Sequence, residues 1–459
     1  MKSCTLLLAF LGSAMALPAV QAGVSAEESA KLGQSLTVFG AEKAGNADGS
    51  IPAYTGGLPV TTNPSGFKRD SGKWISPFAQ EKPLYSITGK NLAQHVDKLS
   101  EASKALLERY PSYRIDVYPT HRTTRYPQYI LDKTLKNATQ ASLAKEGLAV
   151  KGAIGGIPFP IPKSGYEVMW NHMARYSGVA AEYHMRNFYV DNTGKLVNSG
   201  EIRLSSSYPF HNPEATAETI KKDDAYIFRQ AYNFTGPARS VGDATTYFDA
   251  IDMEAMPRRA YTYSASTRRV RLGPDIAYDT PIASQGGVTT YDDANLYSNK
   301  MDRFDFKLVG KREMLIPYSI YDLSFQVKSD KSLTQNHVNP DVVRWELHRV
   351  WVVEATLKPG FRHLYSKRRF YLDEDWSGAG MSDEYDGAGK LYKGLFQGMT
   401  QLYDKEIPLA QTYWAYDLSS GVYSFSQHMA DLELGWRVGD KPQPNRVFTP
   451  EALQNRSGR

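Results

Sequence analysis

Two consecutive strand patterns constrain the fold of this chain more than any other feature. Residues 343–355 alternate between an apolar face, interrupted by Arg349, and a charged face that carries Arg344, Glu346, His348 and Glu354. The turn sequence Lys358-Pro359-Gly360 follows, and residues 361–372 predict a returning strand. Successive side chains of a strand point to opposite faces of its sheet. Long antiparallel strands with aromatic rings on one face are typical of a strongly curved sheet.

Shorter strand patterns surround this pair. Residues 182–190 and 195–197 flank the turn sequence Asp191-Asn192-Thr193-Gly194, which predicts a hairpin. Further strands are expected at 226–234, 245–251, 259–265, 268–272 and 302–308, the last of them half-exposed, and a final hairpin at 412–417 and 422–425. No fixed period relates these segments, so the pattern is not that of a repeat protein.

Helix patterns are fewer and lie mostly near the N-terminus. Leucines at helical spacing predict helices over 91–110 and 133–146, and Ser25 with Glu28 forms a capping-box pattern. Pro450 is placed to begin a short terminal helix. We therefore predict an α+β fold: one domain over 23–459, in which a helical and extended portion, 23–150, covers the strand-rich portion, 151–459.

The first 22 residues have the pattern of a cleavable signal peptide. Lys2 precedes an apolar run over 5–20, and Val20-Gln21-Ala22 suits cleavage. The only cysteine, Cys4, lies before that run, so it is not placed as a lipoprotein acceptor. If the signal peptide is cleaved, Cys4 leaves with it, and the remaining chain has no thiol for disulfides or metal ligation. This suits an oxidising compartment. We expect an exported, periplasmic protein that is not a lipoprotein.

Composition narrows the function classes. A formal net charge of +5 on 459 residues is too small and too scattered for a nucleic-acid-binding surface. No later segment has the roughly 20 apolar residues of a transmembrane helix. Aromatic residues make up 12% of the chain, which favours sheets and binding surfaces.

Several ordered motifs together resemble a family of Gram-negative exported proteins, domain of unknown function thirteen-twenty-nine. The motifs are Gly155-Gly156-Ile157-Pro158-Phe159-Pro160 with Trp170-Asn171-His172, Arg268-Arg269-Val270-Arg271 with Tyr278-Asp279, Lys307-Leu308-Val309-Gly310-Lys311-Arg312-Glu313-Met314, Asn46-Ala47-Asp48-Gly49, and Asp373-Glu374-Asp375-Trp376. The resemblance implies a LolA/LolB-like fold, a curved antiparallel half-barrel closed by helices around an apolar cavity. It also implies a role in envelope transport of a lipid or another hydrophobic molecule, together with a resistance-nodulation-division-type exporter and a companion outer-membrane protein. It supplies no catalytic residues.

No catalytic or cofactor signature is present. The nine histidines form no zinc-type motif, and no Gly-x-Ser-x-Gly sequence occurs. His172 and His184 could converge on a metal, although buried hydrogen bonding is the commoner role for such residues. We expect no catalytic site, metal or cofactor; if the protein were an enzyme, Glu167, His172 and His184 would be the first groups to test.

The acidic segment 373–386 and the arginine pairs leave two alternatives each. The carboxylates could hold a cation or form a solvated hairpin loop. Arg258-Arg259 and Arg268-Arg269 could contact an anionic ligand or lie in solvated edges, and each pair offers at most one inward side chain. His172, Arg259 and Arg269 are the polar contacts we predict.

The aromatic residues are the stronger candidates for a ligand site. Residues 155–172 are expected to run as an extended entrance to the strands, with two of their rings at the cavity rim. The predicted cavity residues are Phe159, Trp170, Tyr261, Tyr263, Phe304, Phe306, Trp345 and Trp351. These rings could instead fill a dry core. The predicted function is a non-enzymatic carrier of a lipid-like molecule; the alternative is a structural or adaptor subunit of an envelope transport complex.

Overall fold

The computed structural model describes residues 23–219, 221–274 and 276–456. The predicted signal peptide, 1–22, lies outside the described residues. One sheet contains strands from both predicted portions of the chain, while the assignment of 23–459 to a single domain stays a prediction.

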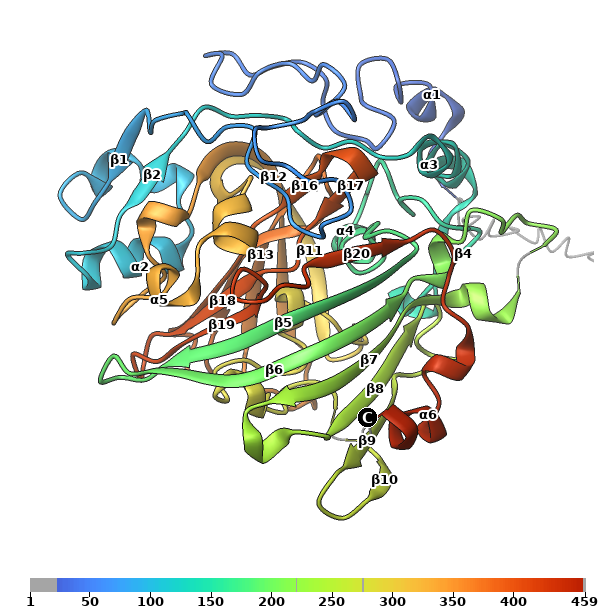
Figure 1. The fold of residues 1–459 in the computed structure, drawn as a ribbon. Helices are drawn as coiled ribbons and strands as arrows, with labels where there is room; N and C mark the ends of the chain where they lie inside the picture. The colour runs from blue at the N-terminus through green and yellow to red at the C-terminus, as the bar shows by residue number, and fades with distance from the viewer. Residues whose placement is uncertain (1–22, 220, 275, 457–459) are drawn as a thin grey trace, which may run out of the picture.

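A 16-stranded sheet organises the molecule (Figure 1). Its order is β1 (Tyr85–Ile87), β2 (Ile115–Val117), β12 (Trp345–Leu357), β13 (Lys367–Asp373), β14 (Ala379–Tyr385), β15 (Leu391–Gln397), β18 (Tyr413–Asp417), β19 (Tyr423–His428), β5 (Ala180–Val190), β6 (Leu196–Ser207), β7 (Tyr226–Gly236), β8 (Ala244–Ala250), β9 (Arg259–Ser264) and β10 (Arg269–Leu272). β11 (Phe304–Pro317) pairs with β12, and β20 (Trp436–Gly439) pairs with β5. The pairings are antiparallel except for a single parallel contact between β2 and β12. The sheet curves without closing into a barrel, which confirms the predicted α+β half-barrel.

Local turn chemistry explains the hairpins that the sequence predicted. Asp191 accepts hydrogen bonds from the backbone of Thr193 and Lys195 and so fixes the turn between β5 and β6. Asp386 caps in the same way the turn between β14 and β15, two strands that the sequence did not predict, by accepting from Ala388 and Lys390. The predicted hairpin of β18 and β19 is also present.

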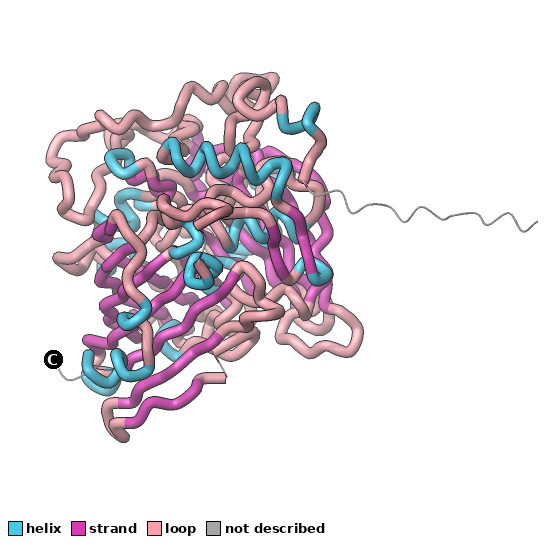
Figure 2. The backbone as a smooth tube through the Cα atoms, turned by 90° about the vertical axis from the view of Figure 1, so that its right-hand side faces the viewer, coloured by secondary structure: helices cyan, strands magenta, loops and turns pink. Residues whose placement is uncertain are grey.

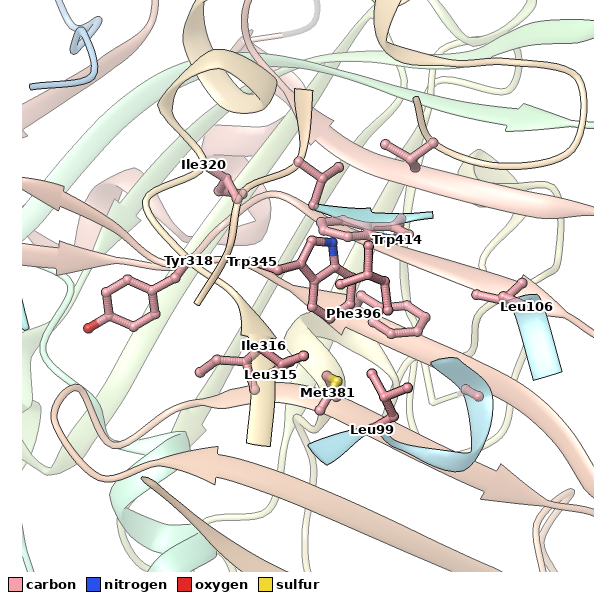
Figure 3. Packing of buried hydrophobic residues seen from close by; sticks show 14 of the residues in the cluster. Leu99, Leu106, Leu315, Ile316, Tyr318, Ile320, Trp345, Met381, Phe396 and Trp414 are labelled. Carbon is pink, nitrogen blue, oxygen red and sulfur yellow. The ribbon is translucent and has the colours of Figure 1, made fainter. Parts of the chain in front are cut away.

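The central strands have apolar clusters on both faces because neighbouring side chains alternate. On one face, Phe396 stacks on Trp414 with ring centroids 5.9 Å apart and packs against Trp345 (Figure 3). On the other face, Leu395 and Ala415 belong to a second cluster. This half of the sheet is therefore an interior layer, whereas β5 to β8 keep one face towards solvent.

The helices are α1 (Ala26–Ser29), α2 (Glu101–Arg109), α3 (Gln128–Gln140), α4 (Gly165–Met173), α5 (Ser329–Ser332) and α6 (Pro450–Arg456). Ser25 and Glu28 form the predicted capping box, and α6 begins at Pro450 as expected. The remaining strands form two small hairpins, β3 (Ser142–Ala144) with β4 (Ala149–Lys151) and β16 (Thr400–Leu402) with β17 (Ile407–Leu409). Helices and long loops cover one end of the sheet, and the hairpin of β9 and β10 lies at the other (Figure 2).

Both predicted N-terminal helices had wrong bounds. The 91–110 pattern is two short 3-10 turns followed by α2, because Ser100 caps the backbone of Ser103 and begins a new helix there. The 133–146 pattern begins earlier, after Pro127, and ends at Gln140, since 142–144 pair as a strand instead.

The prediction that 155–172 is extended throughout was also wrong. Its second half is α4: Ser164 accepts from the backbone of Glu167, an N-cap that the Ser-x-x-Glu spacing encodes. α4 begins at Gly165, where a Cβ would lie 2.5 Å from the Phe306 carbonyl oxygen. Glycine therefore allows α4 to approach β11 closely.

Residues 361–366 are likewise a loop rather than the start of a strand, since β13 begins at Lys367.

Candidate functional site

The concave face of β5 to β8 carries a hollow lined mainly by apolar and aromatic side chains. It contains about 610 Å³ of space unoccupied by atoms, part of it open to solvent. We call it the aromatic hollow; its main residues are Met185, Ile202, Tyr232, Phe234, Tyr247 and Tyr413. The volume to compare with other cavities is about 80 Å³, which is below the roughly 300–1,000 Å³ of small-molecule sites, so a ligand of that size would enter only if neighbouring segments moved.

A second, more polar hollow, with a cavity volume of about 40 Å³, adjoins the first. The two share Tyr247 and Asn295. We call the second one the arginine hollow, because Arg175 lines it together with Ser177, Tyr208, Gln230 and Gln411. The neighbouring hollows thus present an apolar compartment beside a polar one.

The segment 276–301, between β10 and β11, covers both hollows. Ile282, Ser284 and Gln285 line the aromatic hollow, and Tyr297 and Ser298 line the arginine hollow. Long connections with little regular structure are frequently functional in compact proteins. Movement of this segment would change access to both hollows.

Buried ion pairs anchor the covering segment to the sheet. Arg368 of β13 contacts Asp292 at 3.0 Å and Asp293 at 2.8 Å, and its Nε lies 2.8 Å from Glu384 of β14. Burial alone would raise the pKa of Asp292, but the Arg368 guanidinium and His363 hold that pKa well below its usual range. Burial also raises the pKa of Glu384. One charge-compensated cluster therefore joins the cover to two strands.

The eight predicted cavity aromatics do not line one cavity. Phe159, Trp170, Phe304 and Phe306 pack in the core cluster beneath α4, and Trp351 lies beside it. Trp345 belongs to the cluster of Figure 3. Tyr261 and Tyr263 pack with Leu453 of α6. Phe159 lines a separate small hollow near Gly23, and Trp170 is fully buried, its indole donating to the Gly147 carbonyl at 2.7 Å.

The predicted polar contacts are dispersed as well. His172 is buried: its Nε2 lies 3.2 Å from the Tyr297 carbonyl oxygen, and its Nδ1 accepts from the Ala379 amide. His184 lies on the face of β5 that points away from the aromatic hollow, beside Thr235 and Glu201. The two histidines therefore do not converge. Burial lowers the pKa of His172 well below its usual value, so this ring is neutral.

Each arginine pair has at most one inward side chain: Arg258-Arg259 has one, and Arg268-Arg269 has none because both are exposed. Arg258 is buried against Asp249, with Nε 2.7 Å from Oδ1, whereas Arg259 is exposed. Arg269 is exposed on β10. Arg259 borders an open groove with Tyr261 and Leu272, away from both hollows.

The acidic segment is buried rather than a solvated loop, because arginines and a lysine from distant positions neutralise it. Arg122 donates from Nη2 and Nε to the two oxygens of Asp375 at 2.6 and 2.9 Å, and Lys311 lies 2.7 Å from Glu374. Asp383 accepts from two amides at the start of α2. The charged face of β12 is buried in the same way, beneath 118–125.

His348, Asp373 and Asp375 offer atoms within 4.8 Å of one another and form a candidate metal-ligand group. Side chains already engage these atoms. His348 lies between Asp373 at 3.2 Å and Glu346 at 3.3 Å, and Arg122 occupies both oxygens of Asp375. Burial lowers the pKa of His348, but its two carboxylate partners raise that pKa to about 9. The arrangement forms a self-contained ion network.

The residues of the two hollows went unrecognised in the sequence. The strand patterns of β7 and β8 were found, but alternation alone does not tell which face is concave. Tyr232 and Phe234 are two residues apart in β7 and therefore lie on the same face of the strand. This spacing was the one sequence feature that indicated an aromatic surface there. Arg175 follows α4 with no motif around it.

Within the described residues, no helix is long and apolar enough to cross a membrane.

An open curved antiparallel sheet, with hollows beneath a covering segment, places this chain in the α+β class of proteins. The chain belongs to the family described as "Protein of unknown function (DUF1329)", whose model matches residues 86–454. The resemblance inferred from the sequence is thereby confirmed. The chain is 40% identical over 434 residues to uncharacterized protein PA3922 of Pseudomonas aeruginosa, covering 92% of each chain.

Two solved structures show more distant likenesses. A DUF1329 family protein from Desulfovibrio piger matches with a TM-score of 0.43 and 15% identity, over 63% of this chain and 97% of that one. The LolA superfamily protein NE2245 from Nitrosomonas europaea matches with a TM-score of 0.36 and 11% identity, over 63% of this chain and all of that one (100%).

Proposed function

We propose that this protein is an exported, periplasmic carrier that binds a lipid or another hydrophobic molecule without chemically changing it. The aromatic hollow beneath the 276–301 segment is the observation that carries the proposal. A ligand buried there loses apolar surface to the protein at about 25 cal/mol per Å², before the costs of binding.

The neighbourhood of the hollow supports binding rather than catalysis. The Tyr232 hydroxyl donates to Gln230 Oε1 at 2.7 Å and lies 2.8 Å from the Tyr247 hydroxyl, so these side chains form a fixed polar wall. Asp249, a carboxylate that lines the neighbouring arginine hollow, is held by Arg258. Handing the ligand to a resistance-nodulation-division-type exporter and a companion outer-membrane protein is part of the same proposal.

Extraction of the purified protein, followed by mass spectrometry, tests the proposal directly. We expect a co-purifying lipid-like molecule, and binding of fluorescent fatty acids to the emptied protein. Phe234→Ala should weaken this binding roughly tenfold, because a ring in contact with the ligand is lost. Phe361→Ala is the matched control, since Phe361 is exposed on a distant loop. Absence of both a native ligand and probe binding would favour the adaptor function instead.

A further inference from the structure

Arg175 is a cation placed inside the protein without a carboxylate. It follows α4 and lines the arginine hollow. Its Nη1 donates to the His172 carbonyl oxygen at 2.8 Å, while its Nε has no hydrogen-bond partner among the described residues. Burial lowers the pKa of Arg175 to about 10. Arg175 as a whole is partly buried, but its Nε is enclosed without a partner, so the guanidinium is only partly satisfied.

Three other arginines with enclosed side chains differ from the partly buried Arg175. Arg122 is paired with Asp375, Arg258 with Asp249, and Arg368 with three carboxylates. Asp249 also borders the arginine hollow, but Arg258 contacts both of its oxygens at 2.7 and 2.5 Å. Within residues 23–219, 221–274 and 276–456, no carboxylate forms an ion pair with Arg175.

Helix geometry alone does not account for this arrangement. A cation after the last turn of a helix interacts favourably with the final carbonyl groups, as Arg175 does with His172. That role is available at the surface, where the guanidinium would keep its water. Burial without a counter-ion is costly unless a partner neutralises the charge. A ligand anion would supply that partner.

We propose that Arg175 binds the anionic end group of an amphiphile whose apolar chain occupies the aromatic hollow. This inference rests on the proposed carrier function and adds the class of ligand. A guanidinium presents paired donors that match the oxygens of a carboxylate or phosphate. The Tyr208 hydroxyl borders the same hollow and, within the described part of the chain, has no hydrogen-bond partner, so it is a second available donor.

Binding of three probes that share one long acyl chain tests the inference: the fatty acid, the alkyl phosphate and the fatty alcohol. We expect the wild-type protein to bind the better anionic probe roughly 10- to 100-fold more tightly than the alcohol. Arg175→Gln should reduce that ratio to about twofold and leave the affinity for the alcohol unchanged. Acetate and inorganic phosphate, tested as competitors, show whether the anion alone suffices; we expect them to compete weakly.

Arg203→Gln is the matched control, because Arg203 is exposed and lies on β6 between the inward-facing Ile202 and Leu204. It should leave the ratio unchanged. Thermal unfolding without ligand gives an independent readout: Arg175→Met should unfold at the same or a higher temperature, since it removes an unpaired buried charge.

The outcomes separate the two proposals. If no probe binds, the carrier function itself is overturned. If acid, phosphate and alcohol bind the wild type equally, the carrier stands and the role of Arg175 is overturned. An equal loss of all three affinities in Arg175→Gln, together with a lower unfolding temperature, would show that Arg175 only supports packing. Displacement of the chain probes by free phosphate or acetate at low concentration would assign the site to a small anion instead.

Discussion

At the residue scale, His348 shows how this protein places charge in its interior. The imidazole is buried between Glu346 and Asp373, in a layer that the sequence suggested to be an ordinary charged strand face. The covering residues come from more than 200 positions away: His121 donates its amide to Glu346, 225 residues along the chain. Alternation revealed the polar face, but only long-range packing could show that it is buried.

We predict that His348 makes the stability of the protein depend on pH. Its pKa is about 9 in the folded protein against an ordinary value of 6.5, so protonated His348 stabilises the fold fully below pH 6.5. That contribution, about 3 kcal/mol, is lost as the pH rises through 9. Urea unfolding at intervals between pH 6 and 9.5 measures it.

The free energy of unfolding of His348→Gln should fall less over this pH range than that of the wild type, by the contribution of protonated His348 given above. His184→Gln serves as the control: burial lowers the pKa of His184 instead of raising it, so folding does not stabilise the protonated form of this ring. Identical pH profiles for the wild type and His348→Gln would contradict the prediction.

At the element scale, the 276–301 segment determines access to the hollows. It is held by the Arg368 cluster at one point and by hydrogen bonds near Ser284 at another, where Ser199 donates to the Ser284 carbonyl oxygen at 2.6 Å. Polar contacts of this kind fix a segment in place yet can be exchanged for water when it moves. The cover is therefore the element that we expect to open during ligand exchange.

A disulfide between Gly200→Cys and Ser284→Cys should lock the cover to β6. A Cβ on Gly200 would lie 3.2 Å from the Cβ of Ser284, a few tenths of an ångström closer than the usual disulfide separation. Oxidation should slow the exchange of a fluorescent fatty acid about tenfold or more, and a reductant should restore it. Each single cysteine variant is a control. Unchanged exchange in the oxidised protein would mean that the ligand enters by another route.

The elements that the sequence could predict are those fixed by residues close together in the chain. The hairpin of β5 and β6 was recognised because the four residues of its turn carry the required chemistry locally. β14 was missed because Asp383 and Glu384 suggest a solvated loop; only α2 and Arg368, distant in sequence, make their burial possible. The hollows were missed for a related reason, since the curvature of the sheet decides which strand face is concave.

At the scale of the whole molecule, the sheet divides into a protected half and an exposed half. β12 has apolar clusters on both faces and neighbours along its length, whereas β10 pairs only with β9 within the main sheet and carries exposed Arg269, Arg271 and Leu272. Charged residues on such an edge also discourage pairing with other molecules.

Hydrogen exchange should follow this division. We expect the amides of β12 and β13 to exchange only through global unfolding and those of β10 to exchange orders of magnitude faster, through local opening. Mass spectrometry of peptic peptides after timed deuteration measures both. Comparable protection of β10 and β12 would contradict the prediction.

Contacts between the two ends of the sequence have a consequence for biogenesis. Asn46 bonds to Glu313, Trp74 to Asp404, and Arg122 to Asp375, so the N-terminal cover rests on segments that are synthesised much later. A ribosome releases residues 23–126 long before those partners exist. The N-terminal cover can complete its packing only after Asp404 has been made, so we expect it to be the part of the emerging chain that is exposed longest to aggregation.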